Sequence, residues 1–151
     1  YMDSHNGKLP INDGIDVISV GVSFLRFLEI AKSLDLYVSV ITDNDGNIDA
    51  LNENYSNYLG ENSCKNINIC FDKDSHKYDG NLENYNYNTL EPCIYRANSI
   101  SILNEVLKKS YNSVDELLNY MKGHKTEVAL KIFESDKTIE FPQYIKDGIS
   151  I

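Results

Sequence analysis

The sequence predicts an α/β fold, in which a small parallel sheet is flanked by helices and followed by a helical C-terminal segment. Short β-branched runs alternate with amphipathic stretches in the first half of the chain, whereas the last third shows only helical spacing. The 151 residues, 42% of them hydrophobic and 25% charged, have the size and composition of one globular domain.

The first elements predict a βαβ unit. Residues 1–14 are polar and punctuated by glycine and proline, so we interpret them as a lead-in to a domain spanning residues 15–151. Residues 15–20 (IDVISV) and 36–41 (LYVSVI) are β-branched runs typical of buried strands, and residues 22–34 between them have helical spacing. Strands joined in this way are expected to be parallel.

A third strand and a long loop are predicted next. Residues 48–59 are a weaker helix candidate, and residues 66–71 (NINICF) alternate polar and apolar side chains as a strand near a sheet edge does. Residues 72–88 are polar, rich in asparagine and tyrosine, and without periodicity, which indicates a long loop. Long loops in compact domains are often functional.

The C-terminal third is predicted to be helical. Residues 96–110 carry apolar side chains on one face. Ser113 and Glu116 form a capping box that opens a second helix through Met121, which Gly123 ends.

Two further helices are expected after Gly123. Residues 125–134 form the first, and Pro142 suits the first turn of the second, which is short and terminal. Four apolar residues of the helix at 125–134 are expected to face inward: Val128, Ala129, Ile132 and Phe133.

Charge and composition exclude several function classes. The net charge of -9 does not attract nucleic acid, so a role on DNA needs metal ions, a local basic patch or another domain. No apolar run approaches the roughly 20 residues of a membrane helix, and no signal peptide opens the chain. The three cysteines lack zinc-ligand spacing, which indicates reduced thiols in a cytoplasmic protein.

The most informative segment is the acidic turn after the predicted strand at residues 36–41. Asp43 and Asp45 follow it directly, and ligands of open α/β sheets bind at the carboxyl ends of strands. Two carboxylates so close together repel each other unless a cation or a proton lies between them, and hard oxygen ligands suit Mg²⁺ or Mn²⁺. An acidic surface turn is the alternative, because Asp, Asn and Gly are also favoured in turns.

Two further candidates lie later in the chain. Glu91 precedes a proline, a position more typical of a solvated loop residue than of a functional acid. Lys125 opens a predicted helix, where a cation opposes the helix dipole unless an acid or an anion lies nearby. A lysine that faces a phosphate and a simple exposed lysine both fit this position.

Four segments together resemble the Toprim domain of the OLD (overcoming lysogenization defect) family of ATP-dependent endonucleases. They are residues 16–32 (DVISVGVSFLRFLEIAK), 40–46 (VITDNDG), 89–92 (TLEP) and 125–135 (KTEVALKIFES). Their order and spacing match over roughly residues 10–150. The family's Toprim domain opens with a Glu-Gly segment whose Glu completes the metal site, and Tyr1–Gly14 contains no Glu. The resemblance therefore treats residues 1–14 as the truncated start of the domain and leaves open whether this piece alone binds metal and cuts DNA.

The resemblance implies a Toprim-like nuclease that hydrolyses DNA with Mg²⁺ or Mn²⁺. Carried over by motif, Asp43, Asp45 and Glu91 are metal ligands, Glu91 also acts in catalysis, and Lys125 is the lysine that assists at the phosphate, with Lys131 as the fallback. The family pairs this domain with an N-terminal ABC-type ATPase in the same polypeptide, which alone would bind ATP. It forms homodimers, and defence against phage is in keeping with it.

Two other function classes remain open. A non-catalytic interaction or regulatory domain could keep the α/β shape with an idle acidic site. Priming or strand passage, which other Toprim proteins perform, is the second; a topoisomerase would need a catalytic tyrosine in an additional domain. Metal dependence separates the nuclease from the non-catalytic class.

Overall fold

The computed structural model describes residues 1–21, 24–77 and 80–150 and has the predicted α/β class. Strands β1 (Val38–Ile41) and β2 (Ile67–Cys70) form a parallel pair, joined by helix α2 (Ile48–Asn54). Val38 lies opposite Ile67 and Ile41 opposite Cys70, and the Thr42 N–H donates to the Cys70 carbonyl beyond the last pair. The strands predicted at residues 36–41 and 66–71 and the helix predicted at 48–59 are therefore confirmed in shortened form.

The strand predicted at residues 15–20 is wrong. Among the described residues this segment has no strand partner, and its Val17 and Ile18 are 82% and 58% exposed. β-branched residues favour extended backbone, but a strand also needs a neighbour to pair with, which a local pattern cannot supply. The βαβ unit expected at residues 15–41 is thus formed one element later, by β1, α2 and β2.

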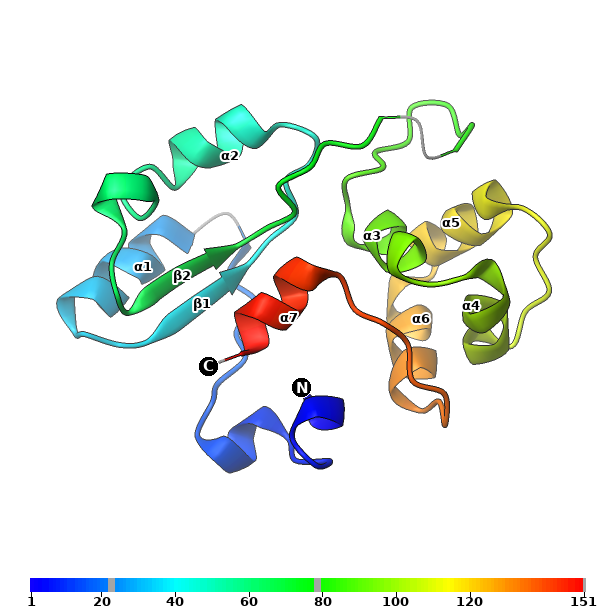
Figure 1. Ribbon diagram of the computed structural model, residues 1–151, viewed down its shortest axis with the longest axis horizontal. Coiled ribbons are helices and arrows are strands. Elements are labelled where there is room, and N and C mark those ends of the chain that lie inside the picture. Colours follow the sequence, from blue (N-terminus) through cyan, green and yellow to red (C-terminus); the bar gives the residue numbers. More distant parts are fainter. Residues whose placement is uncertain (22–23, 78–79, 151) are drawn as a thin grey trace.

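The N-terminal residues lie apart from the sheet (Figure 1). Residues 1–14 contain two short 3-10 turns, Met2–Ser4 and Pro10–Asp13, with no buried side chain. Helix α1 (Phe24–Ser33) confirms most of the helix predicted at 22–34, although residues 22–23 lie outside the described part of the chain. No helix in the described part of the chain is both long enough and apolar enough to cross a membrane.

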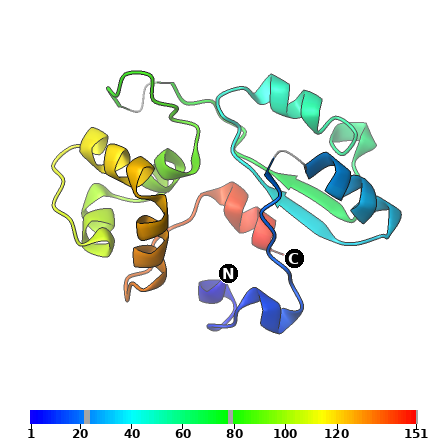
Figure 2. The same ribbon diagram turned by 180° about the vertical axis from the view of Figure 1, so that it is seen from behind.

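The two faces of the sheet pack against different helices, as the two-residue period of a strand requires. Val38, Val40, Ile67 and Ile69 join a core with Leu28 of α1 and Leu51 of α2. Ile41 and Cys70 meet helix α7 (Gln143–Ile149), where the Gly148 backbone lies against them. In both views α7 lies between the sheet and the helices α3–α6 (Figures 1 and 2).

Four helices make the second half of the molecule: α3 (Leu90–Ala97), α4 (Ile100–Leu107), α5 (Val114–Gly123) and α6 (Lys125–Phe133). The single helix predicted at 96–110 is wrong in extent, because Asn98 adopts extended backbone and separates α3 from α4. The helix start at Leu90 was not predicted, although Pro92 is tolerated in a first helical turn. Leu103, Leu107, Leu117, Leu118 and Met121 fill the core between these helices.

The predictions for α5, α6 and α7 hold in outline. Ser113 caps α5, because its hydroxyl accepts a hydrogen bond from the Glu116 N–H at 3.3 Å. The Glu116 carboxylate accepts from the Asn112 N–H, and not from the Ser113 N–H as a capping box requires. In α6 Val128 is buried and Ile132 half-buried. The inward orientation predicted for Ala129 and Phe133 is wrong: both are exposed, since the helix packs through a narrower stripe than its apolar content suggests.

Candidate functional site

Asp43 lies just beyond the carboxyl end of β1, and three elements meet around it. Its Oδ1 accepts a hydrogen bond from the Tyr144 hydroxyl of α7 at 3.1 Å. Its Oδ2 accepts from the backbone N–H of Leu90, the first residue of α3, at 3.2 Å. A carboxylate beside the first N–H groups of a helix is favoured by the helix dipole. Asp43 is therefore half-buried and oriented through both of its oxygens.

Glu91 lies next to this contact, in the first turn of α3, and is buried. Its Oε1 forms an ion pair with the Lys125 Nζ at 3.0 Å, and its Oε2 accepts from the Thr89 hydroxyl at 3.2 Å. Lys125 begins α6 and its side chain is 66% exposed. A lysine at the start of a helix opposes the helix dipole unless an acid lies nearby, and for Lys125 this acid is Glu91.

The charges of the site act on Asp43. Burial raises the pKa of the Asp43 carboxyl above its ordinary value, and the Tyr144 hydrogen bond opposes this rise. The negative charges of Asp45 and Glu91 raise the pKa further, while the Leu90 N–H lowers it. A cation near Asp43 would remove this repulsion and favour the ionised carboxylate.

Asp45 lies at the rim of the site, with an exposed side chain and a left-handed backbone at φ 51°. The Asn86 amide donates to the Asp45 carbonyl at 3.2 Å and to its Oδ1 at 3.4 Å. Asp45 thus faces solvent, unlike Asp43, while remaining close enough to act on the Asp43 pKa.

Buried asparagines hold the acidic turn against the long loop. The Asn44 amide donates to the carbonyls of Asp72 and Asp74 at 2.7 and 2.8 Å, and its Oδ1 accepts from the Gly46 N–H at 2.8 Å. Gly46 has φ +78°, and a Cβ there would lie 2.9 Å from the Asn88 amide nitrogen. This packing explains both the asparagine between the two acids and the glycine after them.

The loop predicted at residues 72–88 has no helix or strand within its described residues, 72–77 and 80–88. Asn88 holds it in place by donating to the His76 carbonyl at 2.7 Å and accepting from the His76 N–H at 2.6 Å. The loop therefore connects the two halves of the molecule. The hydrogen bonds of Asn44 hold its beginning, and those of Asn88 hold its end.

Asp72 and Tyr144 also belong to the surroundings of the site, and sequence reasoning missed both. Asp72 follows β2 as Asp43 follows β1, and its Oδ2 lies 3.4 Å from Arg96 and 3.4 Å from His76. Together with Cys93 and Tyr144 they line a cleft of about 500 Å³. The position directly after a predicted strand could have indicated Asp72, whereas no local pattern indicates Tyr144.

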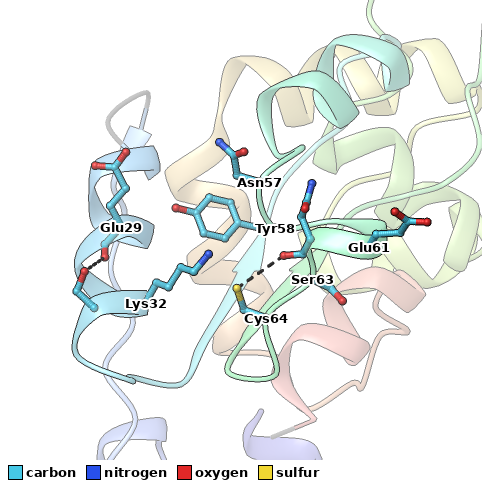
Figure 3. Close-up of a pocket in the computed structure, with 9 residues that line it drawn as sticks. Glu29, Lys32, Asn57, Tyr58, Glu61, Ser63 and Cys64 are labelled. Carbon is cyan, nitrogen blue, oxygen red and sulfur yellow. Dashed lines mark hydrogen bonds between the residues drawn. The ribbon is translucent and has the colours of Figure 1, made fainter.

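A second cleft, of about 560 Å³, lies elsewhere and contains none of the predicted site residues. Figure 3 shows it between α1, which provides Glu29 and Lys32, and the segment after α2, which provides Tyr58 and Cys64. The Cys64 thiol donates to the Asn62 carbonyl at 3.8 Å. All three cysteines of the chain are free thiols.

The structure brings together Asp43, Glu91 and Lys125, which come from three segments spread over 83 residues of sequence. It does not bring in Lys131. That lysine donates to the Leu107 carbonyl at 2.9 Å and forms an ion pair with Glu127 at 2.8 Å, within its own helix.

The donor chemistry of the site fits a hard cation. Within the described ranges, no three His, Cys, Asp or Glu side chains are placed to share a metal ion. Mg²⁺, however, is commonly held by one or two carboxylates together with water and substrate phosphate. Asp43 and Glu91 supply two such carboxylates, and each of their oxygens retains a lone pair beside the one hydrogen bond or ion pair it makes.

Comparison with known proteins gives no match: neither a protein-family model, nor a curated protein, nor a solved structure matches this chain.

Proposed function

We propose that this chain is the Toprim-like nuclease domain of an OLD-family ATP-dependent endonuclease, and that it hydrolyses DNA phosphodiesters with Mg²⁺ or Mn²⁺. One observation carries the proposal. Asp43, Glu91 and Lys125, which the family motifs single out, lie in one connected set of contacts at the carboxyl end of β1. In this proposal DNA is the substrate, and the ATPase and the second subunit are provided by the rest of the polypeptide and by a second copy.

Each residue has a distinct task in this mechanism. Asp43 and Glu91 would hold the cation, with Asp45 at the rim adding negative charge. When bound, the cation activates water and stabilises the leaving oxygen. The Lys125 ammonium, 66% exposed, would turn from Glu91 to the phosphate and offset its charge. Because the chain is acidic overall, this lysine and the cation supply the local positive charge that DNA needs.

The test compares Asp43→Ala/Asp45→Ala with Glu53→Ala/Asp136→Ala, which removes the same charge from exposed positions. The unmodified chain and the control are expected to bind Mn²⁺ and to nick supercoiled DNA in a Mn²⁺-dependent manner. The site variant should bind no Mn²⁺, and its nicking should fall to the metal-free background. Nicking that survives in the site variant, or an unmodified chain without Mn²⁺ affinity, contradicts the proposal.

A non-catalytic interaction or regulatory domain is the second candidate. It is favoured by the observation that both oxygens of Asp43 and both of Glu91 already have protein partners. In that role the acids would join β1, α3, α6 and α7 into one structure. Mn²⁺ binding by the unmodified chain decides between the two candidates.

A further inference from the structure

Tyr144 contacts the site from the far end of the chain. Its side chain is 6% exposed, and its hydroxyl donates to Asp43 Oδ1 at 3.1 Å across 101 residues of sequence. The ring packs with Cys70 of β2 and Cys93 of α3, so the sheet, α3 and α7 all fix its position. A buried phenol held on three sides is a rigid donor.

How closely α7 packs on the sheet determines where the Tyr144 hydroxyl lies relative to β1. Gly148 lies one helical turn after Tyr144, on the same face of α7. A Cβ at position 148 would lie 2.7 Å from Ile41 Cδ1 and 3.6 Å from the Cys70 Cβ, so only glycine lets the helix approach this closely. The close approach brings Tyr144 to the carboxyl end of β1, where Asp43 lies.

The two hydrogen bonds to Asp43 constrain different oxygens. The Leu90 N–H holds Oδ2, and Tyr144 alone among the described side chains is seen to donate to Oδ1. With only the Leu90 contact, the carboxylate could rotate about its side-chain torsions. With both, its plane is fixed and the remaining lone pairs keep a constant direction relative to Asp45 and Glu91.

We propose that Tyr144 is a positioning residue for Asp43, and that helix α7 is thereby part of the acidic site. Its hydroxyl fixes the orientation in which the Asp43 carboxylate binds its ligand. The identity of that ligand as a divalent cation rests on the proposed nuclease function, whereas the orienting hydrogen bond does not. Outer hydrogen bonds of this kind hold metal-binding side chains in place, and removing one usually costs metal affinity.

The experiment compares Tyr144→Phe with Tyr58→Phe. Both substitutions remove one hydroxyl from a buried tyrosine, because Tyr144 is 6% exposed and Tyr58 is 5% exposed. Tyr58, however, belongs to a different core, the one around Leu28 and Leu51. Mn²⁺ affinity should fall roughly 10- to 100-fold in Tyr144→Phe and stay unchanged in Tyr58→Phe. Far-UV circular dichroism establishes that both variants are folded. Unchanged Mn²⁺ affinity in a folded Tyr144→Phe overturns the proposal.

A metal-free measurement separates this proposal from the proposed function. In EDTA, the side-chain carboxyl ¹³C resonance of Asp43 should shift in Tyr144→Phe and not in Tyr58→Phe. If the unmodified chain binds no Mn²⁺, the nuclease proposal fails, and this resonance still decides the role of Tyr144. An unshifted Asp43 resonance overturns the positioning role.

A second variant covers the case in which Tyr144→Phe does not fold. Asp43→Ala removes the acceptor and leaves the buried ring of Tyr144 in place. The Tyr144 hydroxyl proton should then exchange with water at least tenfold faster than in the unmodified chain, and faster than in Cys93→Ala, which removes the other hydrogen-bond partner of this hydroxyl. Unchanged exchange in Asp43→Ala overturns the hydrogen bond on which the proposal depends.

Discussion

At the scale of single residues, the site shows how burial decides what an ion pair is worth. Lys125 and Lys137 each pair with a glutamate, and both lysine side chains are 66% exposed. Their partners differ: the Glu91 side chain is 8% exposed and that of Glu105 is 56% exposed. A buried carboxylate cannot recover its lost hydration from water, so it depends on its partner more than an exposed one does.

This difference predicts unequal costs for the same substitution. Lys125→Met should lower the free energy of unfolding by about 1 kcal/mol, a value kept small because the lysine itself is solvated. Lys137→Met should change it by less than about 0.5 kcal/mol. Urea unfolding followed by circular dichroism measures both. Equal effects of the two substitutions would show that Glu91 does not rely on Lys125.

At the scale of elements, the sequence predicts local periodicity well and partner choice poorly. Helices α1, α5 and α6 and strands β1 and β2 follow from spacing and caps within a few residues. The segment 15–20 is rich in β-branched residues like β1, but it pairs with no strand in the described part of the chain and residues 16–19 are exposed. Composition favours an extended chain, but only a neighbouring strand makes it part of a sheet, and that neighbour is a tertiary property.

The same limit applies to the site. Asp43 and Lys125 could be selected from sequence because each stands beside a predicted strand or helix boundary, and Glu91 because the segment TLEP resembles a family motif, although their roles stay predictions. Tyr144 could not, since its approach to Asp43 depends on how α7 docks across the sheet. Asn44 could not be distinguished from an ordinary turn residue, because its partners lie 28 and 30 residues away.

The docking of α7 gives a prediction at this scale. In Gly148→Ala the added methyl would meet the Cγ1–Cδ1 arm of Ile41, so either this side chain must change rotamer or α7 must shift. The free energy of unfolding should fall by about 1–3 kcal/mol. Gly123→Ala is the matched control, because that glycine is also helical and nothing lies within 4 Å of its added Cβ.

Thermal and urea unfolding distinguish the two glycine variants. Gly123→Ala should be neutral or stabilise by up to about 1 kcal/mol, since alanine favours helix more than glycine does. If both substitutions leave stability unchanged, α7 does not dock closely against Ile41 and Cys70. The position of the Tyr144 hydroxyl beside Asp43 would then need another explanation.

At the scale of the whole molecule, the site lies where two separate cores meet. One core holds α1, α2 and the sheet, and the other holds α3–α6. Cys70, Cys93 and Tyr144 form a small third cluster between them, with one residue from each of β2, α3 and α7. Asp43 bonds to α3 and α7 from the sheet side, so a ligand on Asp43 and Glu91 would join both halves.

This placement makes cation binding a stability measurement on the entire chain. A ligand that binds only the folded state at 100 times its Kd stabilises by about 2.7 kcal/mol. For a domain of this size each kcal/mol raises the Tm by roughly 2–4 °C, so saturating Mn²⁺ should raise it by about 5–10 °C. Glu53→Ala/Asp136→Ala should keep this rise, and Asp43→Ala/Asp45→Ala should lose it. A rise that persists in the site variant would mean that Mn²⁺ binds the acidic surface generally, since that variant keeps every other carboxylate.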